Sequence, residues 1–299
     1  MLDCLIIGAG PAGLTAAIYL ARFRRQILVL DAGSPRAALI PSTRNFPGFP
    51  DGVSGEHLLA RLREQAAVHG VAVNPARVDV IERQAEGFIA CAGEQSWEAR
   101  TLVLATGVRD QHPDFPGLLD ATLGGVVRWC PICDGFEILD KEIALLAPAK
   151  AGLAHAEFLR TYTKNLTLFA LPDSEGLTPE EIARLEAAQI ELVTESLVSC
   201  HARAQGEGID LVLASGGTRH FDTLYPMQGS SAQCELATCL GAQRTDCGDI
   251  LVDAHQQTSV PGLYAVGDVV NALNQISVAL GHAAIAATAV HNRLPRNPR

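Results

Sequence analysis

Two cysteines separated by two residues form the most reactive pattern in the sequence. They lie in the segment Trp129-Cys130-Pro131-Ile132-Cys133-Asp134-Gly135. This spacing brings two sulfurs within disulfide reach and can lower the pKa of one thiol, which is how dithiol–disulfide exchange is driven. Asp134 follows directly and is suited to accept or donate a proton. The pattern predicts a redox-active pair, with Cys130, Cys133 and Asp134 as catalytic residues.

The same spacing occurs in zinc sites and in thioredoxin itself. A zinc site needs two further ligands, and Cys234 and Cys239 are far away with the wrong spacing, so no metal is predicted. A chain of 299 residues is far longer than a thioredoxin, and the pair follows a predicted domain boundary. An inert buried pair is the remaining structural alternative. The other cysteines are interpreted as core or surface residues without chemistry.

A glycine-rich turn near the start of the chain is the second chemical signal. Gly8-Ala9-Gly10-Pro11-Ala12-Gly13 joins the apolar strand expected over residues 2–7 to an Ala- and Leu-rich helix expected over 14–23. The first glycine allows a tight turn, the second leaves room for a pyrophosphate, and the third lets the helix approach the strand. The helix N-terminus then presents free N–H groups and the positive end of its dipole to the phosphates.

An acidic residue completes this signal. Asp31 ends a second apolar strand expected over residues 26–30, where its carboxylate can accept hydrogen bonds from ribose hydroxyls. A glycine turn that only packs a helix would not explain an acid at this strand end. The pattern therefore predicts dinucleotide binding, although the loop alone does not distinguish FAD from NAD.

Composition limits the classes of protein to consider. Hydrophobic residues make up 48% of the chain and charged residues 19%, the net charge is −10 and the pI is about 5.3. An acidic chain argues against a nucleic-acid groove and against an anionic membrane surface. No apolar run reaches the length of a membrane span and no export signal is visible. Scattered cysteines then predict a reducing, cytoplasmic location.

The order of expected elements predicts an α/β fold with two Rossmann-like three-layer domains. The first is discontinuous, over 1–116 and 226–299, and a second nucleotide-binding-like domain, over 117–225, is inserted into it. Within the first domain, a helix is expected over 54–70 with Ser54 as N-cap. A small antiparallel meander is expected from strands near 71–73, 78–82 and 88–91.

The second domain repeats the strand–turn–helix plan. Strands are expected over 142–146 and 166–170, with helices over 153–161 and 179–188. The chain then returns to the first domain, with a strand over 262–266 and a long Ala-rich helix over 275–294.

Together, these features resemble the low-molecular-weight thioredoxin reductase family of flavoproteins. The resemblance covers nearly all of the first domain and rests on motifs in the family's order: Gly8–Gly13, Asp31, Asn45-Phe46-Pro47-Gly48-Phe49-Pro50, Ala105-Thr106-Gly107, Cys130–Gly135, Thr258 to Asp268 and the helix start from Gln275. It implies FAD as the cofactor, a homodimer, and a thioredoxin-like protein or a small dithiol or disulfide as the partner.

The resemblance also implies roles for matching residues. Asn45 would lie against the isoalloxazine, Asp268 would bind the ribityl–pyrophosphate part of FAD, and Gln275 with the backbone of Ile276 would approach the pyrimidine edge. Cys133 would face flavin C4a, and Cys130 would attack the partner's disulfide. Asp134 would accept or donate the proton. The FAD-binding residues predicted on this basis are Gly8, Gly10, Pro11, Ala12, Gly13, Asp31, Asn45, Thr106, Gly107, Gly267, Asp268, Gln275 and Ile276.

His282 stands early in the same helix, where relatives often have a small residue. It is a further catalytic candidate, hypothesised to hydrogen-bond the flavin or the dithiol. The alternative is a histidine that is simply a satisfied polar group at a helix end.

The second domain departs from the family pattern where relatives bind NADPH. The expected glycine loop aligns with Ala147-Pro148-Ala149-Lys150-Ala151-Gly152, where side chains intrude and Pro148 removes an N–H. Leu171-Pro172-Asp173-Ser174-Glu175-Gly176 replaces the basic cluster that would grip a 2′-phosphate, and its acids would repel one. Asp173 leaves weak NADH binding as an alternative.

The sequence therefore predicts a thioredoxin-reductase-like, FAD-dependent disulfide oxidoreductase that is not driven by NADPH. Electrons would come from ferredoxin or another donor, and exchange with a thioredoxin-like partner would proceed through Cys130 and Cys133. Three alternatives remain open: a small-molecule dithiol oxidase that uses oxygen, a flavin redox sensor without efficient turnover, and an ordinary NADPH-driven enzyme of the family.

Overall fold

The chain folds into two compact units in a computed structural model that describes residues 1–203 and 206–298. Unit 1 consists of Met1–Ala38, Ser54–Arg109 and Ser230–Arg299, and unit 2 of Leu39–Val53 and Asp110–Gly229. The predicted fold class, a discontinuous α/β domain with a second one inserted, is confirmed. The observed limits differ from the predicted ones in two respects. The segment Leu39–Val53 groups with unit 2, and unit 2 extends over Asp110–Gly229 rather than over 117–225.

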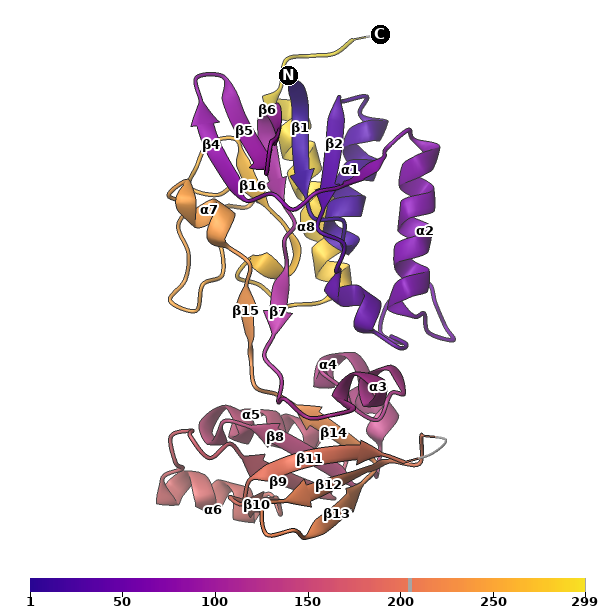
Figure 1. The fold of residues 1–299 in the computed structure, drawn as a ribbon, viewed down its shortest axis with the longest axis vertical. Helices are drawn as coiled ribbons and strands as arrows, with labels where there is room; N and C mark the ends of the chain where they lie inside the picture. The colour runs from indigo at the N-terminus through magenta and orange to yellow at the C-terminus, as the bar shows by residue number, and fades with distance from the viewer. Residues whose placement is uncertain (204–205, 299) are drawn as a thin grey trace. The chain divides into compact units, whose positions relative to one another are not determined.

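Unit 1 is built on a mixed sheet with the strand order β3-β2-β1-β6-β5-β4, and β16 also pairs with β6 (Figure 1). Its strands are β1 (Leu2–Ile7), β2 (Ile27–Asp31), β3 (Val73–Pro75), β4 (Val80–Gln84), β5 (Gly87–Ala92), β6 (Gln95–Leu104) and β16 (Leu263–Ala265). The strands β3, β2, β1, β6 and β16 run parallel to one another. The carboxyl ends of β1, β2 and β6 therefore meet at one edge, which is where open α/β sheets bind ligands.

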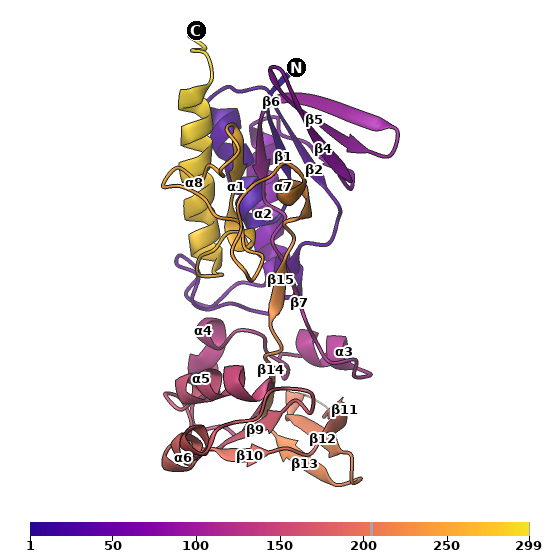
Figure 2. The same ribbon diagram turned by 90° about the vertical axis from the view of Figure 1, so that its left-hand side faces the viewer.

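Helices cover one face of this sheet. They are α1 (Pro11–Arg22), α2 (Gly55–Val68) and α8 (Ile276–Arg293), and α8 lies beside α1 (Figure 2). The predicted N-cap is confirmed, since the Ser54 hydroxyl accepts a hydrogen bond from the His57 N–H at 3.2 Å. On the opposite face, β1 and β6 side chains pack with residues from the segment that carries α7 (Glu235–Cys239).

The predicted antiparallel meander is partly wrong. β4 pairs antiparallel with β5, as expected. β5 also pairs antiparallel with β6, which was not part of the predicted meander. The third strand, β3, instead pairs in parallel with β2, for example Val73 with Val29. It follows helix α2, and a strand–helix–strand connection returns the chain in parallel to the same sheet. Three residues carry too little alternation to reveal this pairing from sequence.

Unit 2 has three layers around a parallel sheet of order β10-β9-β8-β14. The strands are β8 (Ile143–Ala147), β9 (Leu166–Ala170), β10 (Glu191–Val193) and β14 (Thr223–Pro226), and the helices on one face are α5 (Ala149–Leu159) and α6 (Pro179–Ala187). Alternate β8 residues serve the two faces: Leu145 packs with the helices and Leu146 packs on the other side. Burial on both faces explains why β8 and β9 read as continuous apolar runs.

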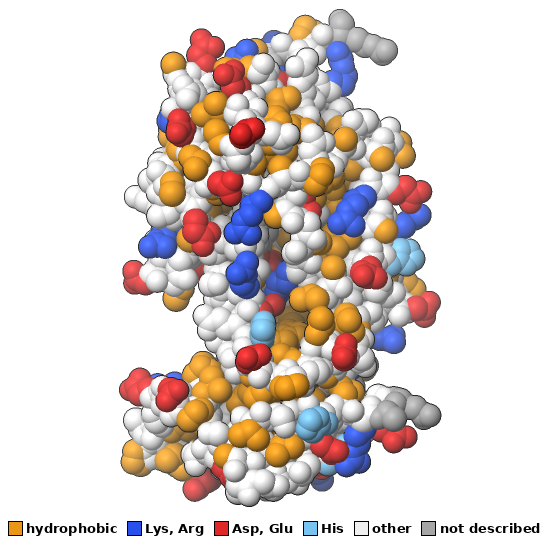
Figure 3. All heavy atoms as spheres, viewed as in Figure 1, with side chains coloured by type: hydrophobic (Ala, Val, Ile, Leu, Met, Phe, Trp, Pro, Cys, Tyr) orange, Lys and Arg blue, Asp and Glu red, His pale blue; other side chains and the backbone are white. Residues whose placement is uncertain are grey.

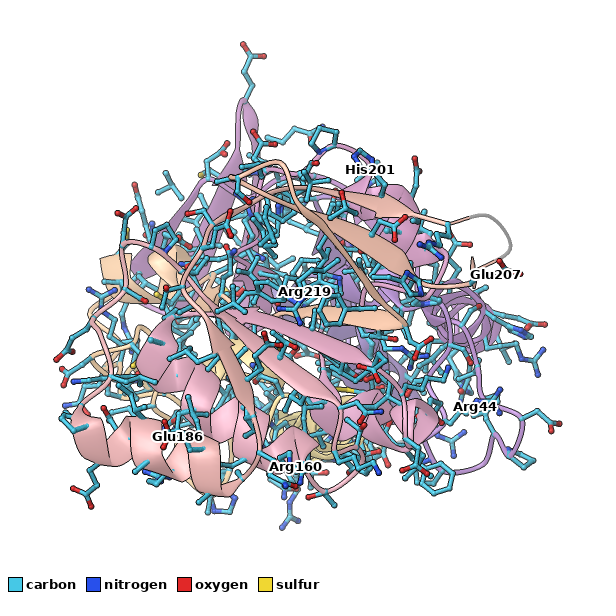
Figure 4. All side chains as sticks on the ribbon, turned by 90° about the horizontal axis from the view of Figure 1, so that it is seen from below. Arg44, Arg160, Glu186, His201, Glu207 and Arg219 are labelled. Atoms are coloured by element: carbon cyan, nitrogen blue, oxygen red, sulfur yellow. A yellow bond between two sulfur atoms is a disulfide. The ribbon has the colours of Figure 1, made fainter. Side chains whose placement is uncertain are left out.

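An antiparallel sheet that the sequence did not predict forms the third layer. It consists of β11 (Leu197–Ala202), β12 (Ile209–Leu213) and β13 (Thr218–Phe221). Figure 4 shows Arg219 toward the middle of this unit, where its guanidinium lies over the rings of Phe169 and Phe221. At the helical face, Arg160 at the end of α5 donates to the carbonyl of Ala188, just after α6 (Figure 4).

Short elements complete the chain. They are β7 (Val108–Asp110), β15 (Ser230–Ala232), α3 (Leu118–Leu123), α4 (Pro131–Asp134) and the 3-10 turns η1 (Arg36–Leu39), η2 (Gly135–Ile138) and η4 (Gly267–Val269). β7 and β15 pair where the chain leaves and re-enters unit 1. On the face shown in Figure 3, acidic and basic side chains are scattered among polar and apolar atoms. Within the described residues, no helix is both long and apolar enough to cross a bilayer.

Candidate active site

The glycine turn at the carboxyl end of β1 has the geometry that its sequence predicts. A Cβ on Gly8, whose φ is +104°, would collide with the carbonyl oxygen of Ala105, and a Cβ on Gly13 would collide with that of Gly8. These contacts hold α1 tightly against the strands. A Cβ on Gly10 would meet no described atom within 4 Å, so space is open at the start of α1.

Asp31 reaches this same turn from the end of β2. Its Oδ1 accepts a hydrogen bond from the Ala9 N–H at 2.9 Å, and its Oδ2 accepts one from the Gly33 N–H at 3.1 Å. The carboxylate is thereby fixed beside the glycine turn. Each oxygen keeps a second lone pair for a hydroxyl donor.

Thr106 and Gly107 lie at the carboxyl end of β6, the third strand at this edge. The Thr106 hydroxyl donates to the carbonyl of Gln233 at 2.7 Å, and the Gln233 side-chain amide donates to the carbonyl of Thr106 at 2.6 Å. The Gln233 N–H also donates to the carbonyl of Gly107 at 2.9 Å. Gln233, which sequence reasoning did not single out, therefore holds this segment in place.

Gly267 and Asp268 lie on the turn η4 of unit 1. The Asp268 carboxylate forms an ion pair with Arg36 at 3.1 Å. His282 lies on α8, and the nearby charge of Asp268 acts on it. Burial lowers the pKa of His282 and Asp268 partly opposes this, so the imidazole is neutral at pH 7. Its Nδ1 is buried and has no hydrogen-bond partner among the described residues.

The start of α8 lacks a side-chain cap among the residues that the structure describes. Gln275 is the N-cap residue in extended conformation, and its side-chain amide donates to the carbonyl of Asn274 at 3.0 Å. Ile276 is the first helical residue. The orphan N–H groups of this first turn can hold an anion or an electron-rich edge.

These features fit a bound dinucleotide. The open space at Gly10 and the uncapped start of α1 suit a pyrophosphate, and the Asp31 carboxylate at the adjacent strand end suits a ribose. The orphaned Nδ1 of His282 is a buried polar atom that a ligand could satisfy. The predicted FAD-binding residues of unit 1 lie on the turns and helix starts at this end of its sheet.

The cysteine pair lies in unit 2, at the start of the short helix α4. Cys130 and Cys133 form a disulfide, and Cys130 is the N-cap residue of α4. The Cys133 N–H donates to Cys130 Sγ at 3.2 Å. A backbone donor on this sulfur stabilises a thiolate, and so favours Cys130 as the nucleophile once the pair is reduced.

Asp134 occupies a pocket of charged and polar groups directly after the pair. Its Oδ1 accepts a hydrogen bond from the Tyr225 hydroxyl at 2.7 Å, and its Oδ2 lies 3.4 Å from Nη1 of Arg128. Burial raises the pKa of Asp134, while the Tyr225 bond and the Arg128 charge act to lower it. Neither partner was singled out from the sequence, and Tyr225 lies 91 residues from Asp134 along the chain.

Asn45 is the one predicted flavin contact that the structure groups with unit 2. Its side-chain amide donates to the carbonyl of Ile132 at 3.4 Å, and its Oδ1 accepts from the Thr43 hydroxyl at 2.8 Å. The neighbouring Arg44 lies 3.8 Å from Glu137. The Asn45 loop is thus attached to the α4 segment that carries the cysteines.

At the start of α5, where the resemblance places the pyridine-nucleotide loop of the family, the first N–H is hydrogen-bonded within the chain. The Ala149 N–H donates to the Ser174 hydroxyl at 3.1 Å, and this hydroxyl donates to the carbonyl of Leu171 at 2.6 Å. Lys150 forms an ion pair with Glu175. The loop after β9 therefore reaches the start of α5 and accepts a hydrogen bond from one of its first N–H groups.

The remaining cysteines form no further disulfide in the described part of the chain. Cys4, Cys200 and Cys234 are buried, and burial raises the pKa of Cys4 to about 12. Cys239 and Cys247 are exposed. Among the described residues, no group of three or more His, Cys, Asp or Glu side chains is arranged to hold a metal ion.

A dinucleotide-binding α/β unit and a disulfide at the start of a helix, carried on one chain, define a disulfide oxidoreductase. A family model described as pyridine nucleotide-disulphide oxidoreductase matches residues 2–283. The chain belongs to this family and is thioredoxin-reductase-like. It is an FAD-dependent disulfide oxidoreductase.

Individual relatives are similar to this chain over nearly its whole length. The thioredoxin reductase of Mycolicibacterium smegmatis is 28% identical over 277 residues, which is 90% of this chain and 88% of the relative. The crystal structure of HlmI has a TM-score of 0.89 at 29% identity, covering 97% of this chain and 92% of that one. Thioredoxin reductase from Streptococcus pyogenes MGAS5005 also has a TM-score of 0.89, at 25% identity, covering 98% and 97%.

Proposed function

We propose that this enzyme exchanges electrons between FAD and a thioredoxin-like protein through Cys130 and Cys133, without using NADPH as donor. The observation that carries the second part is the capped start of α5. Its first N–H is already bonded to Ser174, and Lys150 is paired with Glu175. A nucleotide phosphate that accepted a hydrogen bond from the Ala149 N–H would have to displace the Ser174 hydroxyl.

In this proposal, each residue of the dithiol site has a separate role. Cys130 attacks the partner's disulfide, Cys133 resolves the mixed disulfide, and Asp134 holds or releases the proton. FAD, when bound, supplies the two-electron exchange with the pair. The predicted FAD-binding residues would hold it at the carboxyl edge of the unit 1 sheet.

Exposed apolar side chains beside the pair support a protein partner. Phe136 is 72% exposed and Ile132 is 50% exposed, and Leu139 is exposed on the same segment. Large apolar side chains around a reactive centre suit the apolar core of a protein interface. Relatives of this chain are named thioredoxin reductases, and we propose a thioredoxin-like protein as its partner. We also propose that the enzyme works as a homodimer in the cytoplasm.

An anaerobic reduction experiment tests the proposed donor. The purified flavoprotein is mixed with excess NADPH and, separately, NADH, and the visible flavin absorbance is followed. We expect no bleaching with either nucleotide and full bleaching with dithionite or a reduced ferredoxin, because the α5 helix end is capped. Rapid bleaching by NADPH would refute NADPH independence.

The substrate is tested by turnover, without oxygen for the reduction of thioredoxin and in air for the oxidase reaction. Electron transfer to an oxidised thioredoxin, with reduced ferredoxin as the source, supports the proposal. Oxygen consumption with small dithiols but not with reduced thioredoxin would instead identify a dithiol oxidase. No multiple turnover with any donor would identify a redox sensor.

His282 is proposed to hydrogen-bond the flavin or the dithiol. Because its buried Nδ1 has no partner among the described residues, we expect His282→Ala to shift the visible flavin spectrum and to lower turnover. Ile285→Ala, an exposed site on the same helix, is the control. A His282→Ala protein with unchanged spectrum and turnover would contradict the proposal.

A further inference from the structure

We infer that Tyr225 and Arg128 are positioning residues for dithiol exchange, which hold the Asp134 carboxylate ionised and in a fixed orientation beside Cys133. This inference rests on the proposed roles of Cys130, Cys133 and Asp134 and names the residues that control the proton in that step.

The geometry assigns Tyr225 as a hydrogen-bond donor. Tyr225 is fully buried and its hydroxyl lies 2.7 Å from Asp134 Oδ1. Burial, assisted by the negative charge of Asp134, raises the pKa of the phenol, so it remains protonated. A protonated phenol facing a carboxylate donates to it, and such a charge-assisted bond stabilises the anion.

Arg128 acts on the second carboxylate oxygen. Its Nη1 lies 3.4 Å from Asp134 Oδ2, and both side chains are largely shielded from solvent. Its buried Nε has no hydrogen-bond partner in the described part of the chain, so the guanidinium is held by packing and by this charge pair. The negative charge of Glu137 acts in the opposite direction, because it raises the pKa of Asp134. Glu137 lies 3.8 Å from Arg44.

Strand β14 is what brings these two groups together. The Arg128 N–H donates to the carbonyl of Leu224 at 2.9 Å, and the Leu224 N–H donates to that of Val126 at 3.0 Å. Tyr225 is the next residue on β14, and it pairs with Leu145 of β8 on the other side. The segment before the cysteine pair and the phenol are thereby fixed to the central sheet of unit 2.

The proton transfer follows from this arrangement. In the reduced pair, the Cys130 thiol gives its proton to the Asp134 carboxylate, and the thiolate attacks one sulfur of the substrate disulfide. The substrate S–S bond breaks, a mixed disulfide forms, and the leaving thiolate takes the proton back from Asp134. Cys133 then gives its proton to the Asp134 carboxylate, and its thiolate attacks Sγ of Cys130. The mixed disulfide breaks, the released substrate thiolate takes that proton from Asp134, and the Cys130–Cys133 disulfide is restored. Two electrons pass from the pair to the substrate.

The test follows a single turnover of the reduced holoenzyme with Ellman's reagent as the disulfide, over a range of pH. Cys239 and Cys247, which are exposed, are first replaced by serine. Falling pH protonates Asp134 and removes the base, so the rate falls on the acid side. Loss of the phenol hydroxyl raises the pKa of Asp134, and we expect Tyr225→Phe to move this acid limb upward by about one pH unit.

Three variants distinguish positioning from a purely structural role. Tyr162→Phe, a tyrosine whose ring packs on Gly135, should give the wild-type profile. Arg128→Met should shift the limb in the same direction as Tyr225→Phe, and Arg128→Lys should restore part of it. In an Asp134→Asn background, Tyr225→Phe should have no further effect.

Two outcomes would overturn the inference in different ways. If Tyr225→Phe lowers the melting temperature but leaves the pH profile superimposable on wild type, the bond to Asp134 is structural only. If the reduced wild-type protein fails to release two equivalents of thiol from Ellman's reagent, the proposed role of the cysteine pair fails, and this inference falls with it.

Discussion

Replacing Cys133 by serine is expected to give a flavoprotein that captures its substrate on Cys130 and does not release it. The Cys133 N–H bond to Cys130 Sγ comes from the backbone and survives this substitution, so Cys130 remains the favoured nucleophile. Without the resolving thiol, the mixed disulfide persists, and multiple turnover should fall by about 10³-fold or more. Mass spectrometry under non-reducing conditions should show one substrate thiol attached to the protein.

The matched variant is Cys130→Ser, which should form no adduct at this site and turn over as poorly. Both variants are made with Cys239 and Cys247 replaced by serine, because these exposed thiols would react independently. Both should retain the yellow colour of bound FAD, since the predicted FAD-binding residues of unit 1 are unchanged. An adduct on Cys133 in the Cys130→Ser protein, and none on Cys130, would reverse the two proposed roles.

Replacing Gly10 by valine is expected to remove FAD while preserving the fold. Gly10 has φ −72° and ψ −175°, a conformation that suits any residue, and a Cβ there meets no described atom within 4 Å. The added methyls would occupy the space for the pyrophosphate. We expect FAD affinity to fall at least about a hundredfold, equivalent to about 2.7 kcal/mol, as measured by flavin release and rebinding.

Two other glycines provide the comparison. Gly281→Ala, on the exposed side of α8, also adds a Cβ into open space and should retain FAD. Gly13→Ala should damage folding itself, because its Cβ would collide with the carbonyl of Gly8. If Gly10→Val keeps FAD with wild-type affinity, the glycine turn is not the pyrophosphate site.

Local patterns predicted most of the regular structure. The strand expected over 166–170 coincides with β9, and the helices expected over 54–70 and 275–294 match α2 and α8 to within a few residues. These elements have long apolar periodicity or a clear cap, so they depend little on distant residues. The three antiparallel strands β11, β12 and β13 were missed, although Ser215-Gly216-Gly217 between β12 and β13 is a turn signal.

The functional residues also divide into those that the sequence could reveal and those that it could not. The glycine turn and the cysteine pair could be recognised from sequence, because spacing along the chain imposes their geometry. For the start of α5, the sequence showed only that the glycines and the basic residues of the family pattern are missing. Only the structure reveals that Ser174 and Glu175 occupy that helix end, because they come from the loop after the next strand.

From the sequence, the dinucleotide turn and the cysteine pair could be predicted because each depends on neighbours in the chain. The fold class and the discontinuous first domain could be predicted from the order of elements and motifs along the whole chain. Tertiary structure alone decided which groups surround Asp134 and which unit carries Asn45. Tyr225 is far along the chain from Asp134, and strand β14 brings it there through pairing with β8 and with the segment around Arg128. Contacts of this kind come from sheet register, and no local pattern of residue types records the register between distant strands.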